Sequence, residues 1–110
     1  MHELTRVRKF QKALEKCIKS GDYKVLGAAV NFSITYISSV EIINFYDEHG
    51  KELDISEVDK CTRGDAKCDV TQRCIEEEGL IIESPKTFDN VSFDATFKDD
   101  SFIVTNVVFK

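Results

Sequence analysis

The N-terminal part of the chain repeats apolar residues at three- and four-residue steps, with lysines and arginines between them. This spacing places the apolar residues on one face of a helix. Ser20-Gly21 follows, and glycine is common just past the end of a helix. The pattern predicts an amphipathic helix whose apolar face carries Leu4, Val7, Phe10, Leu14, Cys17 and Ile18.

A second, short helix is predicted directly after the first. Asp22 can cap its N-terminus, since an aspartate side chain accepts hydrogen bonds from the first free backbone amides. The apolar positions of this helix are Val25, Leu26, Ala29 and Val30. Residues 31–37 then alternate between apolar and polar side chains, which predicts a half-buried strand.

Residues 38–50 give conflicting indications. Their β-branched residues favour a strand, followed by a turn and a return strand. Ser38 and Glu41, in contrast, have the spacing of a capping box, and Gly50 suits the position just past a helix. We favour the helix, with the strand as the alternative.

The middle of the chain is predicted to be irregular. Residues 59–69 are mostly polar and predict a loop. Asp69 and Gln72 form a further capping pair, which predicts a short helical turn. An apolar strand follows at 80–82 and is ended by the turn residues Ser84-Pro85.

The C-terminal part is predicted to be a hairpin. Residues 91–97 and 102–109 alternate between apolar and polar side chains, and the polar residues 98–101 form the turn between them. The residues expected to meet in the core are Phe93 and Phe97 of the hairpin and Phe10 and Leu14 of the first helix.

Helices at the start and strands at the end predict an α+β domain. The expected architecture is N-terminal helices packed on a curved antiparallel sheet with a long C-terminal hairpin. A length of 110 residues suits a single domain over 1–110.

Charge is unevenly distributed along the chain. The formal net charge is −5, yet residues 1–30 hold seven Lys and Arg against three Asp and Glu. A net-acidic domain is a poor nucleic-acid binder, because phosphates need a positive face. No window is apolar enough to cross a membrane and no secretory signal is visible. We therefore expect no nucleic-acid or membrane partner and a cytoplasmic protein, or a periplasmic or secreted one if a signal peptide has been removed.

Two segments resemble a known family. ALEKCIKSGDYKVLGAAVNFSITY (residues 13–36) and ISSVEIINFYDEHGKEL (residues 37–53) are similar to the opening of bacterial immunity proteins with the cone-shaped, nuclear-transport-factor-two-like fold. The resemblance implies a helix, a Gly-Asp step, a short helix, a strand and a capped helix. It also implies a function in which the protein covers the active surface of a toxin.

Three of the four cysteines lie close together in the sequence. Cys61, Cys68 and Cys74 are separated by intervals that do not match zinc-binding pairs, and no histidine is near them. We therefore expect no metal site. A Cys61–Cys68 disulfide could close a short loop in an oxidising compartment, and free thiols are the alternative.

Catalytic chemistry is hard to assemble from this sequence. The two histidines, His2 and His49, lie at the terminus and beside a turn, and no nucleophile or phosphate-binding motif occurs. We expect no catalytic residues and no cofactor. An isomerase-like enzyme or small-molecule binder, with Tyr36 and Asp94 facing a pocket, is one alternative. A secreted, disulfide-bonded modulatory protein displaying the tripeptide Arg63-Gly64-Asp65 in a loop is another.

The remaining candidate chemistry is acidic. A domain without catalytic residues acts by presenting a surface, and acidic clusters attract a basic partner. We predict a non-enzymatic, protein-binding domain, with an immunity protein that neutralises a basic bacterial toxin as its most concrete form. Phe45 or Tyr46 is expected to anchor the contact. The candidate partner-binding residues are Asp47, Glu48, Glu52, Asp54, Glu57, Asp59, Glu76, Glu77 and Glu78.

Overall fold

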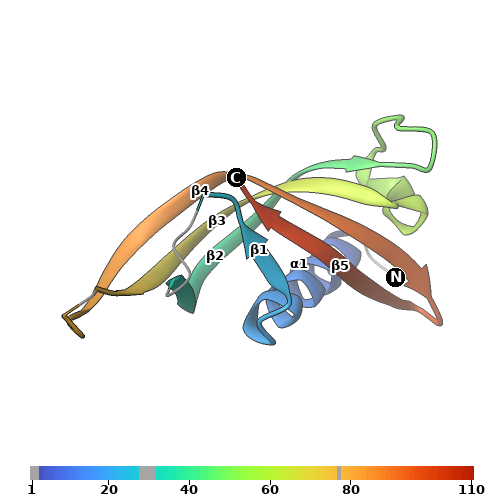
Figure 1. Cartoon of the computed structure of the whole chain (residues 1–110). Coiled ribbons are helices and arrows are strands. Elements are labelled where there is room, and N and C mark those ends of the chain that lie inside the picture. Colours follow the sequence, from blue (N-terminus) through green and yellow to red (C-terminus); the bar gives the residue numbers. More distant parts are fainter. Residues whose placement is uncertain (1–2, 28–31, 77) are drawn as a thin grey trace.

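The computed structural model describes residues 3–27, 32–76 and 78–110, which form an α+β domain (Figure 1). Side chains are described from residue 5 onward. The elements in chain order are the helix α1 (Glu3–Lys19), the strands β1 (Tyr23–Val25) and β2 (Phe32–Tyr46), the 3₁₀ helix η1 (Ile55–Lys60), and the strands β3 (Arg63–Ile75), β4 (Ile81–Lys98) and β5 (Ser101–Phe109).

The sheet is mixed rather than antiparallel. Its strand order is β1-β5-β4-β3-β2, and β1 pairs with β5 in parallel, whereas the other neighbours are antiparallel. The sheet is arched, and α1 lies on its concave side beneath one half of it (Figure 1). The predicted C-terminal hairpin is confirmed, since β4 and β5 pair from Val91↔Phe109 to Lys98↔Ser101.

The core forms where the apolar face of α1 meets the arch. The Phe10 ring is fully buried, with its centroid 5.3 Å from that of Phe93, 5.4 Å from that of Phe45 and 4.5 Å from that of Phe102. The predicted contact between the first helix and the hairpin is therefore confirmed for Phe93. Phe97 is only half-buried and packs on Phe102.

Gly64 lies in β3 where the phenyl ring of Phe93 crosses the backbone. A Cβ atom at this position would lie 2.5 Å from Phe93 Cζ and 2.7 Å from the Asn44 carbonyl oxygen. Glycine is therefore required by a close approach within a strand. The expected display of Arg63-Gly64-Asp65 in a loop is wrong, because all three residues are paired with β2 and with β4.

Three predicted helical segments are strands or turns. The predicted helix after Asp22 is β1 and the turn at 26–27, and its residues 28–30 lie outside the described residues. The segment 38–50 continues β2 to Tyr46, so the favoured helix is wrong. The capping pair Asp69 and Gln72 lies within β3. In each case pairing with a neighbouring strand outweighs a local capping pattern.

A predicted loop and a predicted turn are also parts of regular elements. The predicted loop over 59–69 contains the end of η1 and the first half of β3. The turn residues Ser84-Pro85 lie inside β4, which runs unbroken from Ile81 to Lys98. Proline is tolerated there because β5 pairs with β4 only from Val91 onward, so β4 is an edge of the sheet at Pro85.

The sheet extends well beyond the helix. We name this extension the wing. It consists of residues 32–36 of β2, residues 71–75 of β3 with Glu76 directly after that strand, and residues 81–86 of β4 with Leu80 directly before that strand. None of these residues is buried, and in Figure 1 the wing projects to the left of α1.

Candidate functional site

The acidic residues singled out from the sequence fall into two separate places. Asp47 to Asp59 occupy the segment between β2 and β3, which we name the loop end and define as residues 47–60. Glu76 and Glu78 lie at the β3–β4 turn, which is the end of the wing. These places are opposite ends of a molecule whose longest extent is 50 Å (Figure 1). Glu77 lies outside the described residues.

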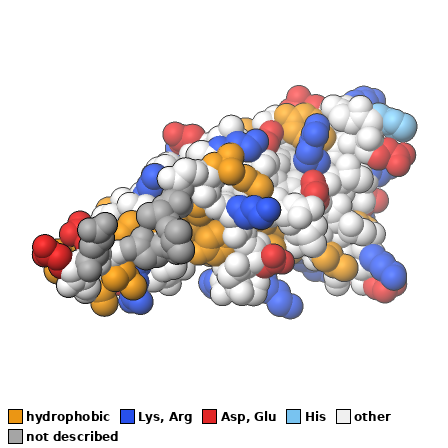
Figure 2. All heavy atoms as spheres, in the orientation of Figure 1, with side chains coloured by type: hydrophobic (Ala, Val, Ile, Leu, Met, Phe, Trp, Pro, Cys, Tyr) orange, Lys and Arg blue, Asp and Glu red, His pale blue; other side chains and the backbone are white. Residues whose placement is uncertain are grey.

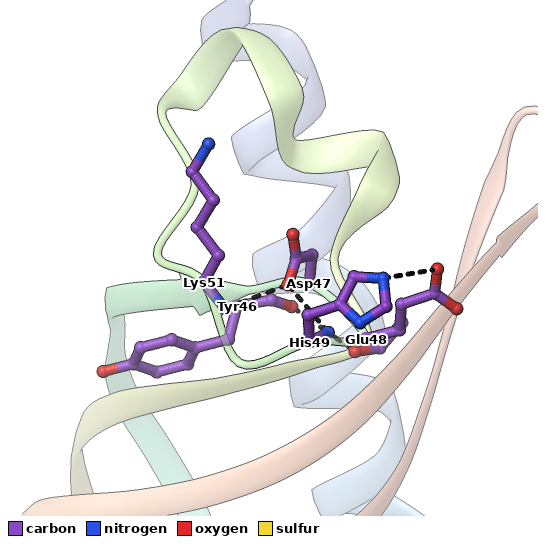
Figure 3. A network of polar contacts seen from close by, with 6 residues as sticks. Tyr46, Asp47, Glu48, His49 and Lys51 are labelled. Atoms are coloured by element: carbon purple, nitrogen blue, oxygen red, sulfur yellow. Dashed lines mark hydrogen bonds and ion pairs between the residues drawn. The ribbon is translucent and has the colours of Figure 1, made fainter.

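The loop end is ordered by one aspartate. Asp47 Oδ1 accepts hydrogen bonds from the backbone N–H of His49 at 2.8 Å and of Lys51 at 2.9 Å (Figure 3). The bond from Lys51, and then that from His49, lowers the pKa of the Asp47 carboxyl below its ordinary value. This aspartate therefore acts as the side-chain cap of its own turn.

Most other carboxylates of the loop end have partners within the chain. These contacts are the ion pairs His49–Glu48 at 3.4 Å, Lys60–Glu57 at 3.6 Å and Arg6–Asp59 at 3.7 Å, and the hydrogen bond from Asn44 Nδ2 to Glu52 Oε1 at 2.8 Å. Asp54 precedes η1 without a side-chain capping bond. Glu57 and Asp59 thus face a lysine and an arginine, whereas His49 is charged only when protonated and the Asn44 amide is neutral, so the charge of this cluster is only partly compensated within the described chain.

The two aromatic residues expected as anchors differ in exposure. Phe45 is 7% exposed and packs on Phe10, so its assignment as an exposed anchor is wrong. Tyr46 is half-buried beneath the guanidinium of Arg63, which lies 5.5 Å from the ring centroid. Burial, and then the charge of Asp65, raises the pKa of its hydroxyl.

The wing tip, defined as residues 75–76 and 78–82, differs in its chemistry. Glu76 and Glu78 are exposed, and no ion pair among the described residues includes either of them. Figure 2 shows acidic side chains at this end with hydrophobic ones beside them. The exposed aliphatic residues there are Ile75 at 40%, Leu80 at 57%, Ile81 at 56% and Ile82 at 41%.

This apolar tip was not recognised as a surface from the sequence. Leu80 to Ile82 were interpreted only as a short apolar strand. Three consecutive apolar residues place side chains on both faces of a strand, whereas a one-sided core needs alternation. The feature that could have revealed the surface is this run, which follows three glutamates and one glycine.

A polar cluster on the convex face of the sheet was also missed. Asp69 accepts hydrogen bonds from the hydroxyls of Ser39 on β2 and Thr87 on β4. The Thr87 bond, and then the Ser39 bond, lowers the pKa of the Asp69 carboxyl. The cluster joins three strands, and it can be found only once the register is known.

The pair proposed for isomerase-like chemistry does not assemble. Tyr36 is 64% exposed and pairs with Thr71, near one end of β3. Asp94 pairs with Arg63 at the other end of β3 and accepts a hydrogen bond from Asn106 Nδ2 at 2.7 Å. The two side chains therefore face no common pocket.

All four cysteines are free thiols, so the Cys61–Cys68 bridge is absent. Cys68 lies within β3 and Cys61 precedes that strand, and the extended chain between Arg63 and Cys68 spans about 16 Å. A disulfide needs Cα atoms within roughly 7 Å. Burial raises the pKa of the Cys68 thiol to about 12 and also raises that of Cys61.

A cavity of about 440 Å³ opens beside the wing. Its walls include Phe32, Cys74 and Phe88, with Lys86 at the rim, where its Nζ lies 4.8 Å from the centroid of the Phe88 ring. Asp89 is the acidic residue of the lining, and its side chain is 82% exposed next to Lys67. The cavity has the volume of a small-molecule site but lacks a buried acid for catalysis.

The comparisons with known proteins do not identify a family. Searches against protein-family models, curated proteins and solved structures find no match. Among the described residues, no group of three His, Cys, Asp or Glu is placed to hold a metal ion. Nor does any described helix combine the length and apolar character that a membrane crossing requires.

Proposed function

We propose that this domain works by binding another protein whose contact surface is basic. The most concrete form of the proposal is an immunity protein that neutralises a basic bacterial toxin by covering its active surface. The observation that supports it most is the distribution of charge in space. Carboxylates gather at both ends of an elongated molecule, whereas the lysines and arginines of residues 1–30 lie mainly along α1.

Charge arranged in this way acts mainly on the rate of encounter. A surface of one sign attracts a partner of the opposite sign over about one Debye length, roughly 10 Å at 0.1 M salt. Association then becomes faster and strongly salt-dependent. If the partner's contact surface is not basic, its association with this domain should show no such salt dependence.

The alternatives have weaker support. A small-molecule binder could use the cavity beside the wing, but that cavity is open and its lining offers no buried acid. A secreted adhesion protein would need a displayed Arg63-Gly64-Asp65 loop, whereas this tripeptide begins β3 and is paired with both neighbouring strands.

The test uses the product of the adjacent gene, since toxin and immunity genes are expected to be neighbours. Asp47, Glu48, Glu52 and Asp54 are neutralised together to Asn or Gln in one variant, and Glu76, Glu77 and Glu78 to Gln in a second. We expect slower association and a shallower salt dependence in at least one of them. A partner that binds with the same rate at low and high salt, or a basic partner that does not bind, contradicts the proposal.

A further inference from the structure

The two ends of the molecule differ in what they could hold. At the loop end most carboxylates have a hydrogen-bond or ion-pair partner within the chain, two of them a lysine or arginine, and the one large exposed hydrophobic residue described there is Ile55. At the wing tip four aliphatic side chains are 40% to 57% exposed, next to two carboxylates without ion pairs among the described residues. Of these two ends, as far as the structure describes them, the wing tip has the larger exposed aliphatic surface beside carboxylates without ion pairs.

The register shows how these apolar residues are presented. Ile75 pairs with Ile81 across β3 and β4, so their side chains are neighbours on one face. Cys74 pairs with Ile82 on β4 and with Phe32 on β2, which forms an apolar row on the other face. The sheet is therefore apolar on both faces where the tip joins the rest of the wing.

The free edge of β2 is a less suitable docking surface. Three register shifts interrupt its pairing with β3, and such bulges bend an edge away from further strands. Two of its backbone groups are already bonded, since Ile34 N–H donates to Tyr23 Oη at 2.9 Å and Gln11 Nε2 donates to the Val40 carbonyl at 3.1 Å.

The negative charge of the wing tip determines which kind of partner it could bind. Three consecutive glutamates in the sequence precede Gly79, and they would repel an anionic membrane. They would also repel the same tip of a second copy, since like charges would meet at close range. A segment with both basic and apolar side chains would satisfy the carboxylates and cover the isoleucines together.

We propose that the wing tip anchors an amphipathic basic segment of a partner protein, with Ile75, Ile81 and Ile82 as apolar contacts and Glu76 and Glu78 as charge contacts. This inference rests on the proposed function and adds the place and the chemistry of the anchor. The loop end then contributes to long-range attraction rather than to the buried contact.

The test compares two matched variants. The tip variant carries Ile75→Thr, Ile81→Thr and Ile82→Thr. The control variant carries Ile43→Thr, Ile55→Thr and Ile103→Thr, three isoleucines outside the wing that are 50%, 44% and 52% exposed. Threonine retains the β-propensity of isoleucine. Circular dichroism and denaturation midpoints verify that both variants fold.

The probe is a fluorescein-labelled peptide of lysine and leucine, with leucines at the spacing of one helical face. A second peptide replaces leucine by serine and keeps the lysines. Fluorescence anisotropy is expected to show about tenfold weaker binding of the leucine peptide to the tip variant and less than about twofold change for the control variant. The serine peptide is expected to bind weakly to all three proteins.

Other results would overturn the inference. Equal losses in both variants, or equal binding of the two peptides, would leave attraction by charge alone and remove the anchor, while binding of a basic partner would stand. If the native chain binds the adjacent gene product but not the leucine peptide, the anchor is likewise removed and binding of a basic partner stands. Sedimentation of a dimer that the tip variant abolishes, or binding to phosphatidylcholine vesicles that it abolishes, would assign the tip to a second copy or to a lipid surface instead.

Discussion

One strand, β3, passes through two regions with different surroundings. In the half of the sheet above α1, the residues of its concave face, Ala66, Cys68 and Val70, are at most 2% exposed. In the wing the same face continues with Gln72 and Cys74, which are half-buried. The backbone geometry is the same in both regions, so the difference comes from what packs against the strand.

The comparison indicates that the alternation of a strand sequence shows which side chains share a face of the sheet, but not whether another element packs on that face. The covered half contains the aromatic cluster around Phe10, and folding stability is expected to reside there. The wing contributes little to burial, and its apolar residues are available for contacts with another molecule. Stability and binding are therefore assigned to different halves of one sheet.

Removing the central ring of the covered half should have the largest effect. Phe10→Ala deletes a fully buried ring that contacts three others, and such a change costs about 3–5 kcal/mol of unfolding free energy. Ile81→Ala in the wing, where the side chain is 56% exposed, should cost less than about 1 kcal/mol. Urea denaturation of both variants measures the difference, and similar costs would contradict the division into two regions.

Thiol reactivity distinguishes the two halves along β3 itself. A pKa of about 12 for Cys68 leaves about one thiolate in 10⁴ at pH 8, and the side chain is fully buried. Cys74 in the wing is half-buried and should react at least about a hundredfold faster with a disulfide reagent. The check is timed modification followed by peptide mass spectrometry. Protection of Cys74 equal to that of Cys68 would mean that the wing is covered in solution.

Gly64→Ala tests the close packing of the covered half. The added methyl group would meet the Phe93 ring and the Asn44 carbonyl, and overpacking of this kind costs about 1–3 kcal/mol. Truncating the ring with Phe93→Leu should make room, so the double variant is expected to lose less than the sum of the single losses. Additive losses would show that the ring does not exclude the methyl group.

The smallest effect is expected at the loop end. Asp47→Ala removes the acceptor of the His49 and Lys51 amides, so hydrogen exchange at those two amides should become faster while the core is unchanged. The folded pKa of Asp47 lies below its ordinary value of 3.8. Its contribution is therefore present above that value and is lost as the pH falls through the lower, folded pKa. Protection factors or chemical shifts of the two amides that stay constant under acid would contradict this role.

The sequence predicted the parts of the fold that depend on regular periodicity. The three- and four-residue steps of Phe10, Leu14 and Ile18 located α1 and its buried face. The alternation in 91–97 and 102–109 located the hairpin. Both elements bury one side against the core, and this one-sided burial is visible as a regular pattern in the sequence.

The errors arose where short-range capping patterns competed with long-range pairing. Ser38 and Glu41 have capping-box spacing, yet both lie in β2, where Glu41 pairs with Lys67. Gly50 adopts a positive φ of +79°, but in the turn after β2 rather than after a helix. The parallel contact of β1 with β5 joins segments far apart in the chain, and no local pattern encodes it.

The candidate site was predictable in composition and not in arrangement. The acidic residues could be identified from the sequence, but whether they form one surface depends on the register that separates Asp47 from Glu76 along the sheet. Phe45 was expected to be exposed, whereas the alternation of β2 directs it toward Phe10. Which charges are compensated within the chain also depends on contacts such as Arg6 with Asp59.

Hydrogen–deuterium exchange of the native chain, with and without the lysine–leucine peptide, tests the central claim most directly. If the wing tip is the anchor, the peptide should slow exchange at residues 71–76 and 80–86 and leave residues 47–60 unchanged, because only backbone covered or stabilised by the bound segment gains protection. Protection at residues 47–60 with an unchanged wing would contradict the account.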